Sequence, residues 1–449
     1  MYDFDTITDR SGTYAIKWDY AHGDLPMWVA DMDFRTAPEV EAAIVERARH
    51  GIYGYTDLPD EWRNAYSGWW ERRHGLKIDP EWLVFCTGVV PAISSMVRKL
   101  TTPAEKVLVQ PPVYNIFWNC IENNGRVPLE SPLVLKDGRY EMDFADLDAK
   151  LADPQCTLML LCNPQNPSGR IWTREELAKV GELAAKHGVT VISDEIHCDL
   201  CDPGFEYVPF ASVSELCRDI SITCVSPTKT FNLAGINTSA VFAADEKLRH
   251  KVWRGINTDD VGEPGAFAVP AAIAAFGKGE PWLKELCAYI AENKRLLGEF
   301  LEANIPEIKL IEGHATYLCW LDIRDITEDD AAFQKFLRKN AGLFVSAGSA
   351  YGAAGKGFLR INLACPRALA LDGFERMRKG AEAWKRKLAD SGQLRSGFKA
   401  KANGKPRIYR NRLSVANPQP FRFQRRTQCL SEYPKICPRP RRCSTRTYS

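Results

Sequence analysis

The amino-acid sequence predicts an α/β protein with a large domain, built on a mostly parallel sheet flanked by helices, and a smaller α/β domain. Strand-like and helix-like segments alternate between residues 82 and 242, which is typical of a parallel sheet covered by helices on both faces. A second, shorter alternation follows a long helical stretch at 282–304. The length of 449 residues also favours more than one domain.

Each expected element is a short run of residues with the period of a helix or of a buried strand. Helices are expected at 37–50, 92–100, 174–187, 282–304, 329–340 and 368–388. Strands are expected at 82–86, 106–110, 157–162, 189–193, 220–225, 239–242, 315–323, 343–345 and 358–363. The chain is therefore expected to divide into an N-terminal arm that also forms part of the small domain (1–45), a large domain (46–280), a small domain (281–390) and a basic tail (391–449).

Composition and charge exclude several classes of protein. No apolar run approaches the roughly 18 residues of a membrane helix, and the acidic start does not resemble a secretion signal, so we expect a cytoplasmic protein without a membrane partner. The 14 cysteines are scattered through apolar runs, which is typical of free thiols in a reducing compartment. The one C-x-x-C, Cys198 to Cys201, has no second pair at zinc-site spacing, so no metal is expected.

The segment 391–449 differs from the rest of the chain because it holds 15 Lys and Arg residues and one acidic residue. Few of its residues are apolar, so we expect a disordered tail. One hypothesis is that this tail binds nucleic acid or another polyanion through its charge. The alternative, which we favour, is an extension without function, so that nucleic acid is not an expected partner.

Lys229 is the first candidate for covalent chemistry. It lies in the sequence Ser226-Pro-Thr-Lys229, directly after the strand expected at 220–225. A lysine amine forms Schiff bases with carbonyls when its site favours the neutral amine, and the hydroxyls of Ser226, Thr228 and Thr230 would suit a phosphate. The same short match is compatible with a serine nucleophile activated by lysine, or with a lysine in a surface loop.

Polar residues follow the other expected strands, at the edge of the sheet where ligands bind in α/β proteins. The turn 87–91 contains a glycine before a helix, which is a weak signal for a phosphate site. Tyr114 follows the strand at 106–110, Asn166 follows the strand at 157–162, and Asp194 follows the strand at 189–193. We expect these side chains to converge with Lys229 on one site.

Three further positions are candidates outside that edge. Arg360 stands in an apolar strand, where a guanidinium needs either a carboxylate of the protein or a substrate carboxylate as its partner. Asp31 lies in an acidic turn between apolar residues and could line a pocket, although packing of an N-terminal arm explains the turn equally well. Tyr55 follows Gly51 and Gly54 in a segment that suggests a loop and could present its phenol.

This order of a phosphate turn, aromatic, amide, carboxylate and lysine resembles the fold type I pyridoxal-phosphate enzymes, over residues 1–390. The resemblance implies the α/β architecture of that transferase-like fold and the cofactor pyridoxal 5'-phosphate. Within the superfamily, five segments are similar to the MalY/PatB branch of cystathionine β-lyases, also called C–S lyases. They are Trp28-Val-Ala-Asp-Met-Asp-Phe34, Thr87-Gly-Val-Val-Pro91, Asn163 to Gly169, Ser193-Asp-Glu-Ile-His197 and Lys229-Thr-Phe-Asn-Leu-Ala-Gly235.

The resemblance implies roles around the cofactor ring. Lys229 would hold the cofactor as an imine and then act as the base at the substrate Cα. Asp194 would keep the pyridine nitrogen protonated, Asn166 would donate to the ring's phenolate oxygen, and Tyr114 would stack on the ring. The role implied for His197 is only a hydrogen bond behind the ring.

For the cofactor phosphate, the resemblance implies the backbone N–H groups of Val89 and Val90 and the hydroxyls of Ser226 and Thr228. Tyr55 would reach the phosphate from a neighbouring subunit, so a homodimer is expected.

For an amino-acid substrate, the resemblance implies that Arg360 binds the α-carboxylate and that Ala30 and Asp31 lie near the side chain. The sequence departs from aminotransferases at Asn237, where those enzymes often have an arginine that binds phosphate.

The activity that this resemblance implies is α,β-elimination of cystathionine or a related cysteine S-conjugate, giving a thiol, pyruvate and ammonia. Thiolate is a good leaving group, so the main task is to stabilise charge at Cα and to align the bonds. The alternative is a class I/II aminotransferase, which shares the early steps and differs in where the proton is returned. The departure at Asn237 favours elimination.

Overall fold

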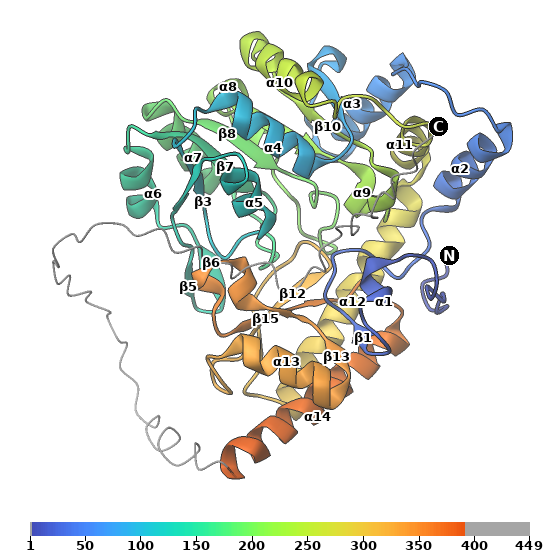
Figure 1. Ribbon diagram of the computed structural model, residues 1–449, viewed down its shortest axis with the longest axis vertical. Coiled ribbons are helices and arrows are strands. Elements are labelled where there is room, and N and C mark those ends of the chain that lie inside the picture. The colour runs from blue at the N-terminus through green and yellow to red at the C-terminus, as the bar shows by residue number, and fades with distance from the viewer. Residues whose placement is uncertain (1, 391–449) are drawn as a thin grey trace, which may run out of the picture. The chain divides into compact units, whose positions relative to one another are not determined.

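The large sheet occupies the middle of the chain in the computed structural model, which describes residues 2–390 (Figure 1). It has seven strands in the order β2-β10-β9-β8-β7-β3-β4, and only β10 is antiparallel to its neighbours. The predicted mostly parallel sheet is thereby confirmed. The strands are β2 (Leu83–Cys86), β10 (Ser239–Phe242), β9 (Ser221–Val225), β8 (Thr190–Asp194), β7 (Cys156–Cys162), β3 (Lys106–Val109) and β4 (Val127–Glu130).

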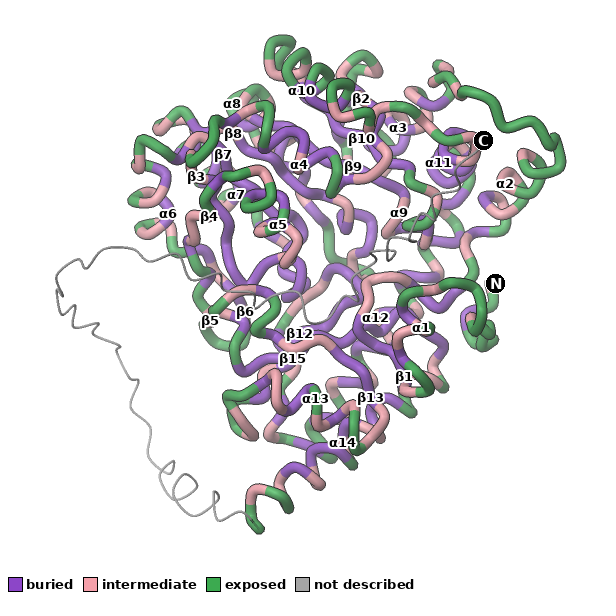
Figure 2. The backbone as a smooth tube through the Cα atoms, in the orientation of Figure 1, coloured by how far each residue is buried: buried purple, intermediate pink, exposed green. Residues whose placement is uncertain are grey.

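Helices cover both faces of this sheet, so its inner strands are buried (Figure 2). Their side chains are accordingly apolar on both sides. In β7, Leu158 and Leu160 pack with one group of helices, whereas Met159 and Leu161 pack with the other. The first group is α4 (Val89–Leu100), α5 (Ile116–Glu122) and α10 (Glu246–Thr258), and the second is α6 (Phe144–Leu151) and α7 (Arg174–Lys186).

A third apolar cluster surrounds α3 (Asp60–His74), whose Trp62, Tyr66, Trp69 and Trp70 are all buried. These residues are spaced at four, three and one positions, which places them on one face of the helix. Around them pack α11 (Ala268–Lys278) and the first part of α12 (Glu280–Asn304), and α2 (Pro38–His50) also packs on α11. We did not predict α3, α10 or α11 from the sequence.

The second sheet is antiparallel and has four strands in the order β11-β12-β15-β14. Its strands are β11 (Lys309–Leu310), β12 (Leu318–Asp322), β15 (Phe358–Asn362) and β14 (Ser346–Ala347), and it packs with α13 (Asp330–Ala341), α14 (Arg367–Asp390) and the end of α12. The N-terminal segment joins this part, because β1 (Leu25–Pro26) pairs in parallel with β13 (Leu343–Phe344). That pairing brings residues 27–33 over the C-terminal ends of the large sheet's strands, where the hydrogen bonds described below fix them.

The short elements complete the fold. They are α1 (Ile16–Asp19), β5 (Val134–Lys136), β6 (Arg139–Glu141), α8 (Glu215–Asp219), α9 (Pro227–Thr230) and the 3₁₀ turns η1 (Pro80–Trp82), η2 (Phe210–Ser212), η3 (Ala234–Ile236), η4 (Gly348–Tyr351) and η5 (Ala353–Gly355).

Predicted and observed boundaries differ most at α4. We assigned residues 87–91 to a turn, but the helix begins at Val89. Pro91 is tolerated there because the first turn of a helix needs no donors to earlier carbonyls. The predicted strand at 239–242 agrees with β10, and most other elements agree within three residues.

Two predictions are left open by the fold. The domain boundaries at 45, 280 and 390 remain predictions, and the basic segment 391–449 lies outside the described residues. Among residues 2–390, no helix combines the length and the apolar character that crossing a membrane requires.

Candidate functional site

Lys229 lies in the short helix α9, which follows β9 directly. The helix begins there because the Ser226 hydroxyl accepts a hydrogen bond from the Thr228 N–H at 3.1 Å and Pro227 occupies the first position. The Lys229 ζ-nitrogen donates to the Ala30 carbonyl at 2.7 Å. Burial lowers the pKa of Lys229 to about 8, with Arg360 adding to the shift and Asp31 and Asp194 opposing it. The amine is therefore easier to deprotonate than an exposed lysine.

Asp194 is the last residue of β8 and is buried next to the lysine. One carboxylate oxygen accepts from the Ile196 N–H at 3.3 Å, and burial raises the pKa of Asp194 to about 6. His197 lies in the turn that follows, and its Nδ1 has no hydrogen-bond partner among the described residues. Burial lowers the pKa of His197 well below its usual range, with Lys229 and Arg360 adding to the effect, so its imidazole is neutral.

Arg360 enters the site from β15 of the second sheet and is buried. It donates to the Asn166 side-chain oxygen at 3.2 Å and to the Trp28 carbonyl at 2.8 Å, and its guanidinium lies 4.7 Å from the centre of the Tyr351 ring. No carboxylate of residues 2–390 forms an ion pair with it, and its Nε has no partner there. The sequence left two possible partners for Arg360, a carboxylate of the protein or one of a substrate. Among residues 2–390, the structure excludes the first.

The phosphate end predicted for the site is formed by the start of α4 and by α9. Val89 and Val90 are the first helical residues, so their N–H groups have no acceptor within the helix. The Ser226 hydroxyl donates to the Thr238 carbonyl at 2.9 Å and lies 2.7 Å from the Thr228 hydroxyl. Both hydroxyls thus already have partners, and their binding of phosphate remains a prediction.

The two predicted tyrosines differ in their surroundings. Tyr114 is half-buried at the start of α5, where it packs edge-on against Phe117 with ring centres 5.8 Å apart. Tyr55 is fully exposed at 102%, in an extended segment before α3. Its contact with a phosphate across a subunit interface remains a prediction.

The turn around Ala30 is held by residues that we did not predict. The Asn362 amide donates to the carbonyls of Val29 and Asp31, at 2.6 Å each, and the Tyr317 hydroxyl donates to the Ala30 carbonyl at 2.9 Å. Asn362 lies two residues after Arg360 on β15 and therefore on the same face, which is a signal that the sequence contained. Nothing in the sequence indicated Tyr317.

The predicted Asp31 carboxylate is tied to the N-terminal segment. Arg10 pairs with Asp31 at 2.9 Å and with Asp33 at 2.8 Å, and the buried Lys17 pairs with Asp33 at 2.7 Å. Trp18 donates to Asp33 as well, at 2.8 Å. These bonds fix the Ala30–Asp31 turn against the lysine.

The residues present fit pyridoxal phosphate. An amine of lowered pKa, a buried carboxylate, the Asn166 amide and the start of a helix converge at one end of the large sheet. The Asn166 oxygen accepts from Arg360, which directs its N–H₂ group elsewhere. The Arg360 Nε and the His197 Nδ1 are further buried polar atoms, and neither has a hydrogen-bond partner among residues 2–390. Such atoms cost free energy unless a ligand or water satisfies them.

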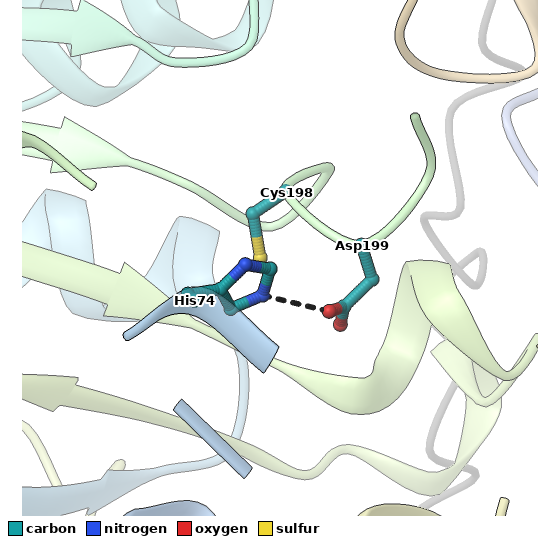
Figure 3. Close-up of side chains that lie close together, drawn as sticks. All are labelled: His74, Cys198 and Asp199. Carbon is teal, nitrogen blue, oxygen red and sulfur yellow. Dashed lines mark hydrogen bonds and ion pairs between the residues drawn. The ribbon is translucent and has the colours of Figure 1, made fainter. Parts of the chain in front are cut away.

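Asp199 is the centre of a second buried cluster, shown with His74 and Cys198 in Figure 3. Its carboxylate accepts from His74 at 2.9 Å and from Trp69, Arg73 and Thr230 at about the same distance. A metal ion would have to displace these donors and lie beside the Arg73 cation. Burial also raises the pKa of the Cys198 thiol well above its usual range, which disfavours the thiolate that a metal needs. These contacts indicate a structural cluster, and the absence of a metal at Cys198 stays a prediction.

We expect Asp199→Asn to lower the free energy of unfolding by about 3 kcal/mol, since it removes the buried charge with which Arg73 pairs at 3.0 Å and leaves that half-buried guanidinium only Glu280, at 3.7 Å. Urea unfolding measures this loss. Asp153→Asn is a matched control, because Asp153 pairs with Lys106 near the surface and should cost less than about 1 kcal/mol. A rise in stability on adding zinc to the unaltered protein would contradict a structural role.

The comparisons with known proteins agree with this geometry. The family described as aminotransferase class I and II matches residues 27–372. The chain is 45% identical to cystathionine β-lyase PatB of Bacillus subtilis, over 84% of this chain and 99% of that protein. It is 34% identical to the protein MalY of Escherichia coli, over 82% of this chain and 96% of that protein.

A solved structure shows the same fold. Cystalysin of Treponema denticola, which contains a pyridoxal 5'-phosphate cofactor, matches with a TM-score of 0.83 and 33% identity, over 85% of this chain and 99% of that chain. The fold is thus that of the fold type I pyridoxal-phosphate enzymes. The chain belongs to the class I and II aminotransferase family and, within it, to the MalY/PatB group of cystathionine β-lyases.

Proposed function

We propose that this protein is a pyridoxal-phosphate-dependent C–S lyase that converts cystathionine, or a related cysteine S-conjugate, to a thiol, pyruvate and ammonia. The observation that carries the proposal is the buried Lys229 amine, which donates to the Ala30 carbonyl at 2.7 Å. The charges of Asp194 and Arg360 both act on the pKa of this amine. The 45% identity with a cystathionine β-lyase over nearly its whole length supports this substrate class.

The chain's own residues would hold the cofactor as follows. Lys229 would bind it covalently, Asp194 would face its ring nitrogen, and the free N–H₂ of Asn166 would donate to its ring oxygen. When bound, pyridoxal phosphate supplies an electron sink for the bond pair released at the substrate Cα. No cation among residues 2–390 forms an ion pair with Asp194, although Lys229 acts on it from nearby, so its charge is available to a protonated ring nitrogen. His197, neutral and buried, would offer its unpartnered nitrogen on the same side as Asp194.

The substrate carboxylate would be bound by Arg360. Its Nε has no partner among residues 2–390, and its Nη1 bond to Asn166 is long at 3.2 Å. The guanidinium can therefore turn its N–H groups to the substrate carboxylate without breaking an ion pair with the protein. The Ala30 turn would then lie beside the substrate Cα, because Ala30 contacts the lysine amine. Asp31, held by Arg10, would face the substrate's side chain.

Lys229 would take the Cα proton on its ζ-nitrogen, which requires the neutral amine. A pKa of about 8 makes that form accessible near neutral pH. Loss of the proton would break the Cβ–S bond, and the sulfur would leave with its electron pair as a thiolate. Water would then convert the remaining three-carbon unit to pyruvate and ammonia, so that the atoms balance as one substrate plus one water.

Aminotransfer is the alternative, and the position of Asn237 bears on it. Asn237 is exposed and has a left-handed backbone, with φ of 56°. An amide at this position cannot supply the charge of the arginine expected in aminotransferases. The relatives named cystathionine β-lyase also favour elimination.

The test is an assay of the purified full-length chain with pyridoxal phosphate and L-cystathionine. We expect pyruvate and a free thiol in equal amounts. A parallel incubation with an amino acid and a keto acid should give little new amino acid. Formation of a new amino acid without pyruvate would reject the lyase in favour of the aminotransferase.

A homodimer is a further part of the proposal. The proposal is supported by exposed apolar side chains, which an interface between two chains would cover. Four of them lie close together in the sequence, in the second half of α2 and just after it: Val45, Ile52, Tyr53 and Tyr55. Sedimentation of the full-length chain should give twice the mass of one chain. Tyr55→Ala should weaken retention of pyridoxal phosphate during dialysis without lowering the stability of the single chain, because Tyr55 is fully exposed within it.

We also propose a cytoplasmic location and the domain limits 46–280 and 281–390. The location is supported by the cysteines, all of which are free thiols among the described residues. The limits are supported by the two sheets, which fall on either side of residue 280.

A further inference from the structure

The Ala30 carbonyl accepts two hydrogen bonds from side chains far away in the sequence. Lys229 donates to it at 2.7 Å and Tyr317 donates to it at 2.9 Å. A carbonyl oxygen has two lone pairs, so both bonds can form at once. The phenol of Tyr317 therefore contacts the same atom as the amine that is proposed to react.

Tyr317 is fixed by its surroundings. It is 1% exposed, and its backbone carbonyl accepts from the Leu363 N–H at 2.8 Å, just after β15. Its ring lies edge-on to His197, with ring centres 6.0 Å apart. Asn362, the neighbour of Leu363, donates to the carbonyls on either side of Ala30. Three consecutive carbonyls of the N-terminal turn are thus held by two adjoining segments of the C-terminal part.

Tyr317 remains a donor over the working pH range. Burial raises the pKa of its hydroxyl above the usual value, so the group stays a phenol. A phenol hydroxyl donates one hydrogen bond, and here the Ala30 carbonyl oxygen accepts it at the normal distance of 2.9 Å. The bond therefore persists whether or not the lysine amine is present.

We propose that Tyr317 is a positioning residue for Lys229, because its hydroxyl holds the Ala30 carbonyl at the place where that carbonyl receives the lysine amine. The inference rests on the proposed function, in which Lys229 is the reacting amine. The Lys229 amine is free before the cofactor binds, and it is free again once the substrate's amine has taken its place on the cofactor. In both states the Ala30 carbonyl offers the Lys229 amine one fixed acceptor.

The phenol also tunes the amine. A carbonyl that already accepts a proton from Tyr317 is a weaker acceptor for an ammonium group, so the bond favours the neutral form of Lys229. The other charged or titratable groups around the amine are Asp31 from the N-terminal turn, Asp194 and His197 from the end of β8, and Arg360 from β15. All of them remain when the hydroxyl alone is removed.

The experiment is Tyr317→Phe in the full-length chain freed of cofactor. The pH dependence of Lys229 acetylation by acetic anhydride, read by mass spectrometry of its peptide, gives the pKa of the amine. We expect the midpoint to rise by about half a unit to one unit, which corresponds to the loss of one hydrogen bond. With cofactor and cystathionine, kcat should fall about three- to tenfold with KM nearly unchanged.

Tyr140→Phe is the matched control, because that buried hydroxyl bonds Trp320 and does not contact Ala30. Its Lys229 midpoint should equal that of the unaltered protein. Tyr317→Leu, a second variant without the hydroxyl, should reproduce the rise. An unchanged midpoint in both Tyr317 variants, or an equal rise in the control, would overturn the inference. The labelling needs neither cofactor nor substrate, so an inactive enzyme would reject the proposed function without deciding the role of Tyr317.

Discussion

Lys229→Ala is expected to abolish pyruvate release from cystathionine, with a loss of at least about a thousandfold in kcat. The variant lacks both the amine that would hold the cofactor and the base for the Cα proton, and a positioned base alone contributes roughly 10²–10⁴-fold. The yellow absorption of the bound cofactor should disappear as well. The measurements are a pyruvate assay and a visible spectrum after dialysis against buffer without pyridoxal phosphate.

Lys335→Ala is the control for this variant, since Lys335 is exposed on α13 and lies outside the site. It should keep the activity and the spectrum of the unaltered protein. Turnover retained by Lys229→Ala would remove the lysine from the mechanism.

Asp194→Asn is expected to lower kcat by about 10²–10³-fold. The substitution keeps the shape of the side chain but removes the buried negative charge that would stabilise a protonated ring nitrogen. Steady-state kinetics with cystathionine measure the loss. Asp372→Asn, an exposed carboxylate on α14 that pairs with Arg376, is the control and should leave kcat unchanged.

The same variant should be more stable than the unaltered protein when the cofactor is absent. Burial raises the pKa of Asp194 to about 6, which means that the folded chain favours the protonated carboxyl. The stability gained in this way is fully present below about pH 4, and it is lost as the pH rises through 6 and the buried group ionises. Asparagine undergoes no such loss. A pKa raised from 3.8 to about 6, with the attraction of Lys229 included, corresponds to about 3 kcal/mol, so we expect Asp194→Asn to gain about that much stability at pH 8.

Urea unfolding of the cofactor-free proteins at pH 8 and pH 4 checks the sign. The difference between the two proteins should shrink at the lower pH, where the aspartate is protonated. A variant that is less stable than the unaltered protein at pH 8 would show that the carboxylate has a stabilising partner in the folded chain. Asp194→Asn should thus lower the activity and raise the stability of the cofactor-free chain. Such opposite effects are expected where a binding site holds an unpaired charge for its ligand.

The sequence alone was sufficient to predict six of the seven strands of the large sheet and where they end, but not β4. The strands at 157–162 and 189–193 could be read because apolar residues run without alternation where a strand is buried on both faces. Since parallel strands end at one edge, Asn166, Asp194 and Lys229 could be grouped before the structure was known. Their types also indicated the chemistry, because few sites need an amide, a carboxylate and a lysine together.

The tertiary structure decided what the N-terminal and C-terminal segments contribute. Ala30 is hundreds of residues from Tyr317 and Asn362, Tyr317 directly precedes β12 and Asn362 ends β15. No period or spacing relates the three residues. They meet because β1 pairs with β13 and because β12 pairs with β15. Long-range pairings of this kind depend on the packing of the whole chain, which local sequence patterns do not encode.

The structure also decided the role left open for Arg360. From the sequence, a buried arginine could equally have paired with a protein carboxylate. Its partners proved to be an amide oxygen and a carbonyl, which neutralise no charge. The sequence by itself thus determined the fold class and indicated the groups proposed to react, whereas only the folded chain showed which charges among residues 2–390 remain unpaired.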